Sequence, residues 1–88
     1  LSVKDLVNYE GVFASQEIPL KITVKMANGQ LTAQATGQKP FNLTPYSSSE
    51  FRFEPAGIIM LFGVDGETVN YSTFQLKQGG GNLKFTRE

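Results

Sequence analysis

The sequence predicts an all-β domain in which about eight short strands form an antiparallel meander and close into a barrel. Apolar and polar residues alternate along most of the 88 residues, a pattern typical of strands with one buried face. Every connection is short enough for a hairpin and too short for a crossover helix, so the strands should run antiparallel. A meander of this length protects its edge strands best by closing on itself.

The chain begins with a short predicted helix and the first strand. Ser2 can serve as the N-cap, Asp5 occupies the third helical position as in a capping box, and Leu6 follows. Residues 9–13 then predict the entry to a strand, in which Gly11 permits a bend or a close approach of another chain segment.

The middle of the chain contains the strongest hairpin signal. Alternating residues predict strands at 20–26 and 30–36, and the Asn28-Gly29 pair between them favours a tight two-residue turn. Residues 41–45 predict a further short strand that ends, or lies at an edge, at Pro45.

The second half departs once from strict alternation. Residues 50–54 alternate, but residues 58–62 within the strand predicted at 58–64 are apolar on both faces, so something must cover the second face. In the strand predicted at 68–77, the apolar face changes partway, and a bulge near Ser72 or Thr73 would reconcile the two halves. Alternation resumes in a last strand at 83–87.

We expect a filled barrel rather than a ligand cavity, because strands this short enclose little space and seven Phe residues can fill it, although Ala33 and Ala35 leave some room. We expect Tyr9, Tyr46 and Tyr71 to lie at the rim with their hydroxyls in water, rather than to line a polar pocket. The predicted core consists of Phe13, Ile22, Val24, Leu31, Phe41, Leu43, Phe51, Phe53, Met60, Phe62, Phe74, Leu76 and Phe85.

The composition excludes several classes of function. Eight basic and eight acidic side chains give zero formal charge, which argues against binding to nucleic acid, and no apolar stretch is long enough for membrane insertion. The chain has no His and no Cys, so the usual catalytic triads cannot form. Asp65 and Glu67 flank one turn but supply too few ligands for calcium. We therefore predict no enzymatic activity, no metal site and no cofactor.

Four segments together carry a resemblance. They are residues 6–13 with Tyr9-Glu10-Gly11-Val12-Phe13, the hairpin end at 30–34, residues 41–47 with Phe51, and residues 74–80 with Phe85-Thr86-Arg87. The arrangement resembles the small C-terminal domain appended to beta-lactamase-like, penicillin-binding-protein-type serine hydrolases and D-aminopeptidases. The resemblance implies a lipocalin-like barrel in an exported, periplasmic or secreted bacterial protein. It implies no catalytic residue in this region.

Two hypotheses for the function follow. We favour an accessory domain that packs on a serine hydrolase or another exported partner through Ile59, Leu61, Val3 and Leu6, since Ile59 and Leu61 point outward if Met60 and Phe62 fill the barrel. It is equally consistent with the sequence that the N-terminal helix covers Ile59 and Leu61 itself. The alternative function is a lipocalin-like carrier of a small apolar ligand. Because the chain starts at Leu1 without Met, we expect it to be one domain, residues 1–88, excised from a longer protein.

Overall fold

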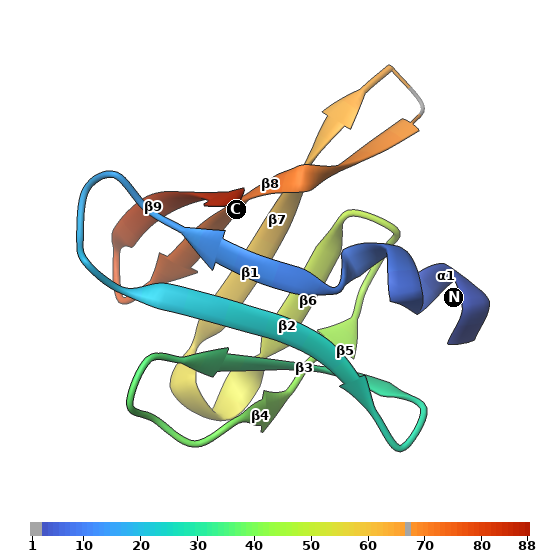
Figure 1. The fold of residues 1–88 in the computed structure, drawn as a ribbon, viewed down its shortest axis with the longest axis horizontal. Coiled ribbons are helices and arrows are strands. Elements are labelled where there is room, and N and C mark those ends of the chain that lie inside the picture. Colours follow the sequence, from blue (N-terminus) through green and yellow to red (C-terminus); the bar gives the residue numbers. More distant parts are fainter. Residues whose placement is uncertain (1–2, 67) are drawn as a thin grey trace.

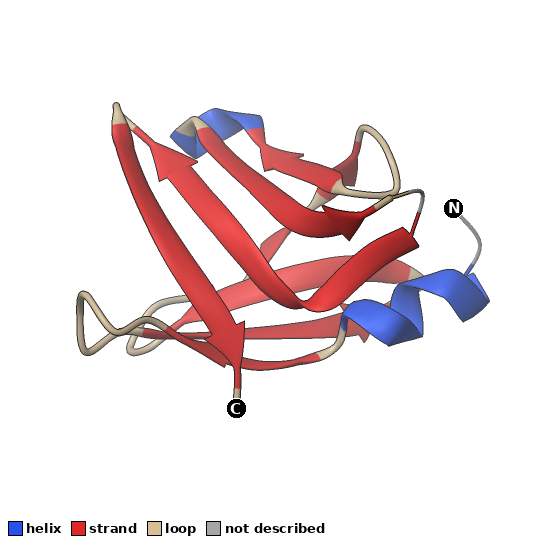
Figure 2. Ribbon diagram, turned by 90° about the horizontal axis from the view of Figure 1, so that it is seen from above, coloured by secondary structure: helices blue, strands red, loops and turns tan. Residues whose placement is uncertain are grey.

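The computed structural model describes residues 3–66 and 68–88 and confirms the all-β barrel (Figures 1 and 2). A single antiparallel sheet curls into a nearly closed barrel, in the strand order β4-β3-β2-β1-β9-β8-β7-β6-β5. The strands are β1 (Gly11–Ala14), β2 (Lys21–Ala27), β3 (Gln30–Ala35), β4 (Phe41–Asn42), β5 (Thr44–Pro45), β6 (Glu50–Phe53), β7 (Ile58–Asp65), β8 (Thr68–Gln78) and β9 (Gly81–Arg87).

The segment 41–45 closes the barrel. Its first half, β4, pairs with β3, and its second half, β5, pairs with β6, with Leu43 alone between them. The amide of Leu43 donates a hydrogen bond of 2.8 Å to the carbonyl of Leu31, so the segment continues the ladder as it passes from one neighbour to the other. The single strand that the sequence predicted here is therefore two short ones, because one bent segment serves both sides of the closure.

The turns and the irregularity in β8 form where local chemistry predicts them. Asn28 and Gly29 both have positive φ, 54° and 76°, which matches the preference of Asn-Gly for two-residue hairpins. Between β7 and β8 the register shifts at Phe62/Gly63: Phe62 pairs with Phe74, whereas Gly63 pairs with Asn70. The residues in between have no partners in the β7 ladder, which confirms the predicted bulge near Ser72 or Thr73. Beyond it, the β7–β8 hairpin projects from the barrel (Figure 1).

The interior is packed with aromatic and aliphatic side chains. All predicted core residues are buried except Phe41, Phe53 and Leu76, which are partly buried and pack against the others. The sequence missed Ala33 and Ile58, which are also buried in this cluster. Phe62 lies among Phe13, Phe51 and Phe74 in edge-to-face or tilted contacts, the arrangement that the charge distribution of aromatic rings favours.

The predicted N-terminal helix is a single turn, α1 (Val3–Leu6), followed by a 3-10 turn, η1 (Val7–Tyr9). Ser2, the predicted N-cap, and the side chain of Val3 lie outside what the structure describes. Leu6 is buried and lines a small hollow with Leu31, Leu43 and Phe51. The prediction that Leu6 belongs to an interaction surface is therefore wrong, because its side chain plugs one end of the barrel.

The prediction that Tyr9 lies at the rim with its hydroxyl in water is also wrong. Only 1% of its surface is exposed. Its ring makes edge-to-face contacts with Phe51, Phe62 and Tyr71, and its hydroxyl donates a hydrogen bond of 2.5 Å to the carbonyl of Ser48. Burial, followed by the effects of Tyr71 and Asp5, raises the pKa of Tyr9 to about 12.

The two ends of the sequence meet where β1 pairs with β9. The ladder there is short, with Phe13 opposite Arg87 and Ala14 opposite Thr86. The Arg87 guanidinium extends it, because it donates hydrogen bonds to the carbonyls of Asn8, Glu10 and Tyr71 and lies over the ring of Phe13. Gly11 has a φ of 156°, which favours glycine, and a Cβ there would lie 2.6 Å from Arg87 Nη1 and displace the guanidinium.

Candidate functional site

The two ends of the barrel are built differently. Connections in a meander alternate between its ends, so the turns at 28–29 and 46–49 lie at the same end as α1 and η1. There Leu6 and Tyr9 fill the opening. The opposite end carries the connections at 15–20 and 36–40, the 3-10 turn η2 (Glu54–Ala56) and the turn at 79–80. At that end a pocket of about 440 Å³ opens into the barrel.

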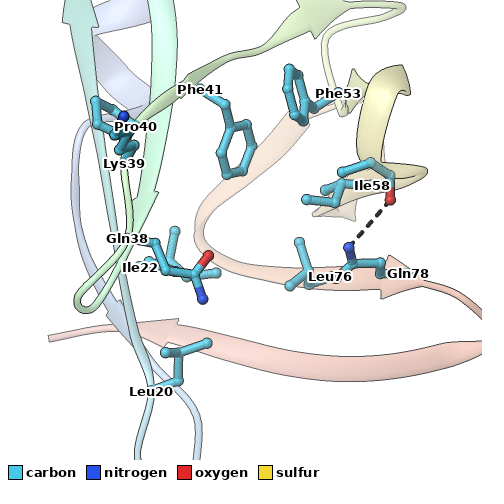
Figure 3. Close-up of a pocket in the computed structure, with 12 residues that line it drawn as sticks. Leu20, Ile22, Gln38, Lys39, Pro40, Phe41, Phe53, Ile58, Leu76 and Gln78 are labelled. Atoms are coloured by element: carbon cyan, nitrogen blue, oxygen red, sulfur yellow. Dashed lines mark hydrogen bonds between the residues drawn. The ribbon is translucent and has the colours of Figure 1, made fainter.

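The pocket lies between two walls (Figure 3). One wall comes from β2 with the residue before it, β3, β4 and the chain between β3 and β4, and the other comes from β6, η2, β7 and β8. Side chains from both walls point into the space between them (Figure 3). The lining residues are Leu20, Ile22, Ala35, Gln38, Lys39, Pro40, Phe41, Phe53, Ala56, Ile58, Leu76 and Gln78.

The deepest part of the lining belongs to the core itself. Ile22 and Ile58 line the pocket and are 3% and 8% exposed, so they separate it from the aromatic interior. Phe41 and Phe53 form an aromatic side of the pocket, with their rings stacked at a centroid distance of 4.7 Å. Partial burial of the three predicted core residues Phe41, Phe53 and Leu76 follows from this position, because each faces the core on one side and the pocket on the other.

Ala35 is the small residue that leaves space at this end. It pairs with Ile22 across the β2–β3 ladder and lines the pocket, whereas Ala33 is fully buried in the core. A larger side chain at position 35 would extend into the volume that is open. The sequence indicated that Ala33 and Ala35 leave room, and only Ala35 borders the pocket.

The polar groups of the pocket lie at its rim. The Gln78 amide donates a hydrogen bond of 3.2 Å to the carbonyl of Ala56 and so ties β8 to η2. The Gln34 amide donates one of 2.8 Å to the carbonyl of Gln38 and steadies the 36–40 turn. Among the described residues that line the pocket, Lys39 is the charged one and none is acidic.

The residues of the predicted interaction surface do not lie together: Leu6 is buried at the plugged end, whereas Ile59 and Leu61 lie on β7. Ile59 and Leu61 point to the outer face of β7, as predicted, and both are partly exposed. Ile59 lies between Arg52 and Lys77 on the neighbouring strands. Leu61 similarly lies between Glu50 and Gln75. Long polar side chains on both sides therefore shield these two residues in part.

The remaining sequence candidates do not assemble into a chemical site. Tyr46 is exposed, its hydroxyl donates to Glu54 Oε1 at 2.7 Å, and Arg52 lies over its ring. Tyr71 is partly buried against the core. Glu67 lies outside the described residues, and within residues 3–66 and 68–88 no three His, Cys, Asp or Glu side chains gather as metal ligands.

The sequence missed the pocket because the pattern of buried faces does not reveal which end of a barrel is plugged. The available signal was the single helix at the N-terminus, which can cover one end only. In the described part of the chain no helix is long and apolar enough to cross a membrane. Comparisons of the chain with models of known protein families, with curated proteins and with solved structures found no match.

Proposed function

We propose that this chain is a non-catalytic binding domain that holds a small apolar ligand in the mouth of its barrel. The observation that carries the proposal is the open pocket of about 440 Å³ between the Phe41–Phe53 pair and the Ile22–Ile58 floor. Ligand pockets in proteins occupy roughly 300–1,000 Å³ and are lined mostly by apolar side chains with a few polar groups. This pocket has both properties.

The energetic argument is the removal of apolar surface from water. Most lining residues are aliphatic or aromatic, so a ligand there would bury its own apolar surface together with theirs. Each Å² of apolar surface removed from water contributes about 25 cal/mol.

The proposal is tested by filling the pocket. We expect 1-decanol to shift the amide NMR signals of Ile22, Ile58 and Leu76 in the wild type and to lose most of this effect in Ala35→Leu, whose side chain occupies the space. Ala27→Leu introduces the same change at an exposed position near the opposite end and should leave binding unchanged. Equal titrations of wild type and Ala35→Leu, or shifts confined to other regions, would contradict the proposal.

A second candidate function is docking, as an accessory domain, on the catalytic domain of a beta-lactamase-like serine hydrolase in an exported bacterial protein. The observation that favours it is the position of Leu6, which is buried in the end of the barrel and so does not cover Ile59 and Leu61 on the outer face. Full burial of an exposed side chain of this size is worth roughly 1.5–3 kcal/mol, and these two, already partly buried, would each contribute a part of that against a partner.

Docking is tested with the double variant Ile59→Ser/Leu61→Ser and with Val64→Ser as an exposed control on the same strand. We expect the double variant to lose association with a catalytic domain added in trans, whereas the control keeps it. Size-exclusion chromatography and the melting temperature are measured together. A lower melting temperature with unchanged association would remove the docking proposal.

A further inference from the structure

We infer that the ligand of the mouth pocket is an amphiphile with an apolar chain and a single carboxylate, held with its carboxylate at Lys39. This inference rests on the proposed function of the pocket and adds the chemical class of the ligand. It follows from the distribution of charge around the rim, which the apolar lining alone does not determine.

The first step is that the described residues lining the pocket carry a positive charge and no negative charge. Lys39 contributes a positive charge to the lining, and no acidic residue among the described lining residues balances it. The ion pairs of the described residues join Lys21 to Glu88 and Arg52 to Glu50, so neither of them uses Lys39. An anionic group at this rim would therefore meet an attractive potential.

The second step is that the acidic side chains at the same end of the barrel as Lys39 contact groups outside the pocket. Glu54, in η2, accepts the hydrogen bond of Tyr46 at 2.7 Å. Glu17, in the 15–20 connection, lines a separate hollow with Lys84. The contacts of Glu54 and Glu17 direct the carboxylates of the open end away from the pocket, and the potential of Lys39 is left uncompensated there.

The third step is that the turn carrying Lys39 is held in place. The amide of Thr36 donates to the carbonyl of Lys21 at 3.0 Å, and the amide of Gln38 donates to the carbonyl of Ala35 at 3.0 Å. Gly37 adopts the positive φ of 77° that this turn needs, and Pro40 restricts the chain after Lys39. Lys39 is therefore presented beside the apolar lining on a backbone already ordered for binding.

The last step selects the anion. Gln38 lines the pocket next to Lys39, so an amide N–H and an ammonium group are both available, and a carboxylate can accept from both. A phosphate dianion is recognised best by several donors or by the bidentate guanidinium of arginine, and no arginine is found among the described lining residues. One ammonium group matches one carboxylate.

The test compares decanoate with 1-decanol, which share the chain and differ in the head group, by isothermal titration at neutral pH and low salt. We expect the wild type to bind decanoate roughly two- to five-fold more tightly, as for other solvent-exposed ion pairs, and high salt to reduce the difference. Lys39→Met should abolish the preference while retaining 1-decanol binding. Lys77→Met, which removes an exposed lysine on the outer face, should keep the preference.

The outcomes separate this inference from the proposed function. If the wild type binds both compounds equally, or if Lys39→Met keeps the preference for decanoate, the assignment of the carboxylate to Lys39 is wrong and the pocket remains an apolar site. If neither compound binds the wild type, the proposed function fails, and this inference fails with it. Circular dichroism of each variant verifies that the barrel is intact.

Discussion

Arg87 is the side chain on which distant parts of the sequence meet. Its guanidinium donates hydrogen bonds to the carbonyls of Asn8 and Glu10, which precede β1, and to the carbonyl of Tyr71 in the β8 bulge. It also contacts two further residues of the segment 6–13. Gly11 makes room for Arg87, and Phe13 lies beneath it. Gly11, Phe13 and Arg87 therefore act together in folding.

Replacing Arg87 should destabilise the barrel more than most single substitutions do. Arg87→Met leaves two partly buried carbonyls and one exposed carbonyl without their donor, and we expect a loss of about 2–3 kcal/mol in the free energy of unfolding. Arg87→Lys should recover less than half, because one ammonium group cannot reach three diverging carbonyls in the way a planar guanidinium does. Urea denaturation measures both. Lys84→Met, an exposed change on the same strand, is the control, and an equal loss there would contradict the assigned role.

Tyr9 predicts how stability depends on alkaline pH. The phenol ionises near its ordinary pKa of 10.0 in the unfolded chain, whereas its pKa in the folded protein is about 12, so its contribution is complete below pH 10 and is lost as pH rises towards 12. This contribution is about 2–3 kcal/mol. We expect the stability difference between wild type and Tyr9→Phe to shrink by about this amount between about pH 9 and pH 12. All other side chains are the same in the two proteins, so a stability difference that does not depend on pH would refute the prediction.

At the scale of the element, α1 and η1 act as a plug rather than as a helix with stability of its own. Four residues of α-helix cannot persist alone, so the packing of Leu6 and Tyr9 must hold the segment in place. The neighbouring side chain of Val7 faces solvent and is 52% exposed. The segment therefore contributes through its two buried residues.

Leu6, which is buried, and its neighbour Val7, which is exposed, allow a matched test. Leu6→Ala should lower the free energy of unfolding by about 2–3 kcal/mol, because it removes buried methyl groups and enlarges the hollow at the plugged end. Val7→Ala should change it by less than about 0.5 kcal/mol. Thermal and urea denaturation of the two variants provide the measurement. Similar losses for both would mean that the segment is held by its backbone and not by Leu6.

The elements also mark the limit of prediction from the sequence. Alternation identified the strands, the Asn28-Gly29 hairpin and the bulge in β8, since each depends on local pattern and turn chemistry. Alternation assigns a residue to one face of a strand but says nothing about its height along the barrel axis. The plug formed by Leu6, the burial of Tyr9 and the position of Lys39 all depend on that height, so they emerged only in three dimensions.

At the scale of the whole molecule, the barrel avoids long exposed edges because the bent segment 41–45 joins its two sides. We expect the amide of Leu43 to exchange with solvent nearly as slowly as that of Val24 in a central strand, since both should open only on global unfolding. Gly66 at the tip of the projecting hairpin should exchange many times faster. Hydrogen exchange monitored by NMR tests this, and a Leu43 amide as fast as Gly66 would show that the closure opens locally.

The short β1–β9 ladder has a mechanical consequence. Because the strands are antiparallel, the beginning of β1 lies beside the end of β9, and the last amide, that of Glu88, bonds to Val12. A force applied to the two ends of the chain would open this ladder one bond at a time instead of shearing all its bonds together. The barrel should therefore yield to stretching at low force, whatever its resistance to heat or denaturant.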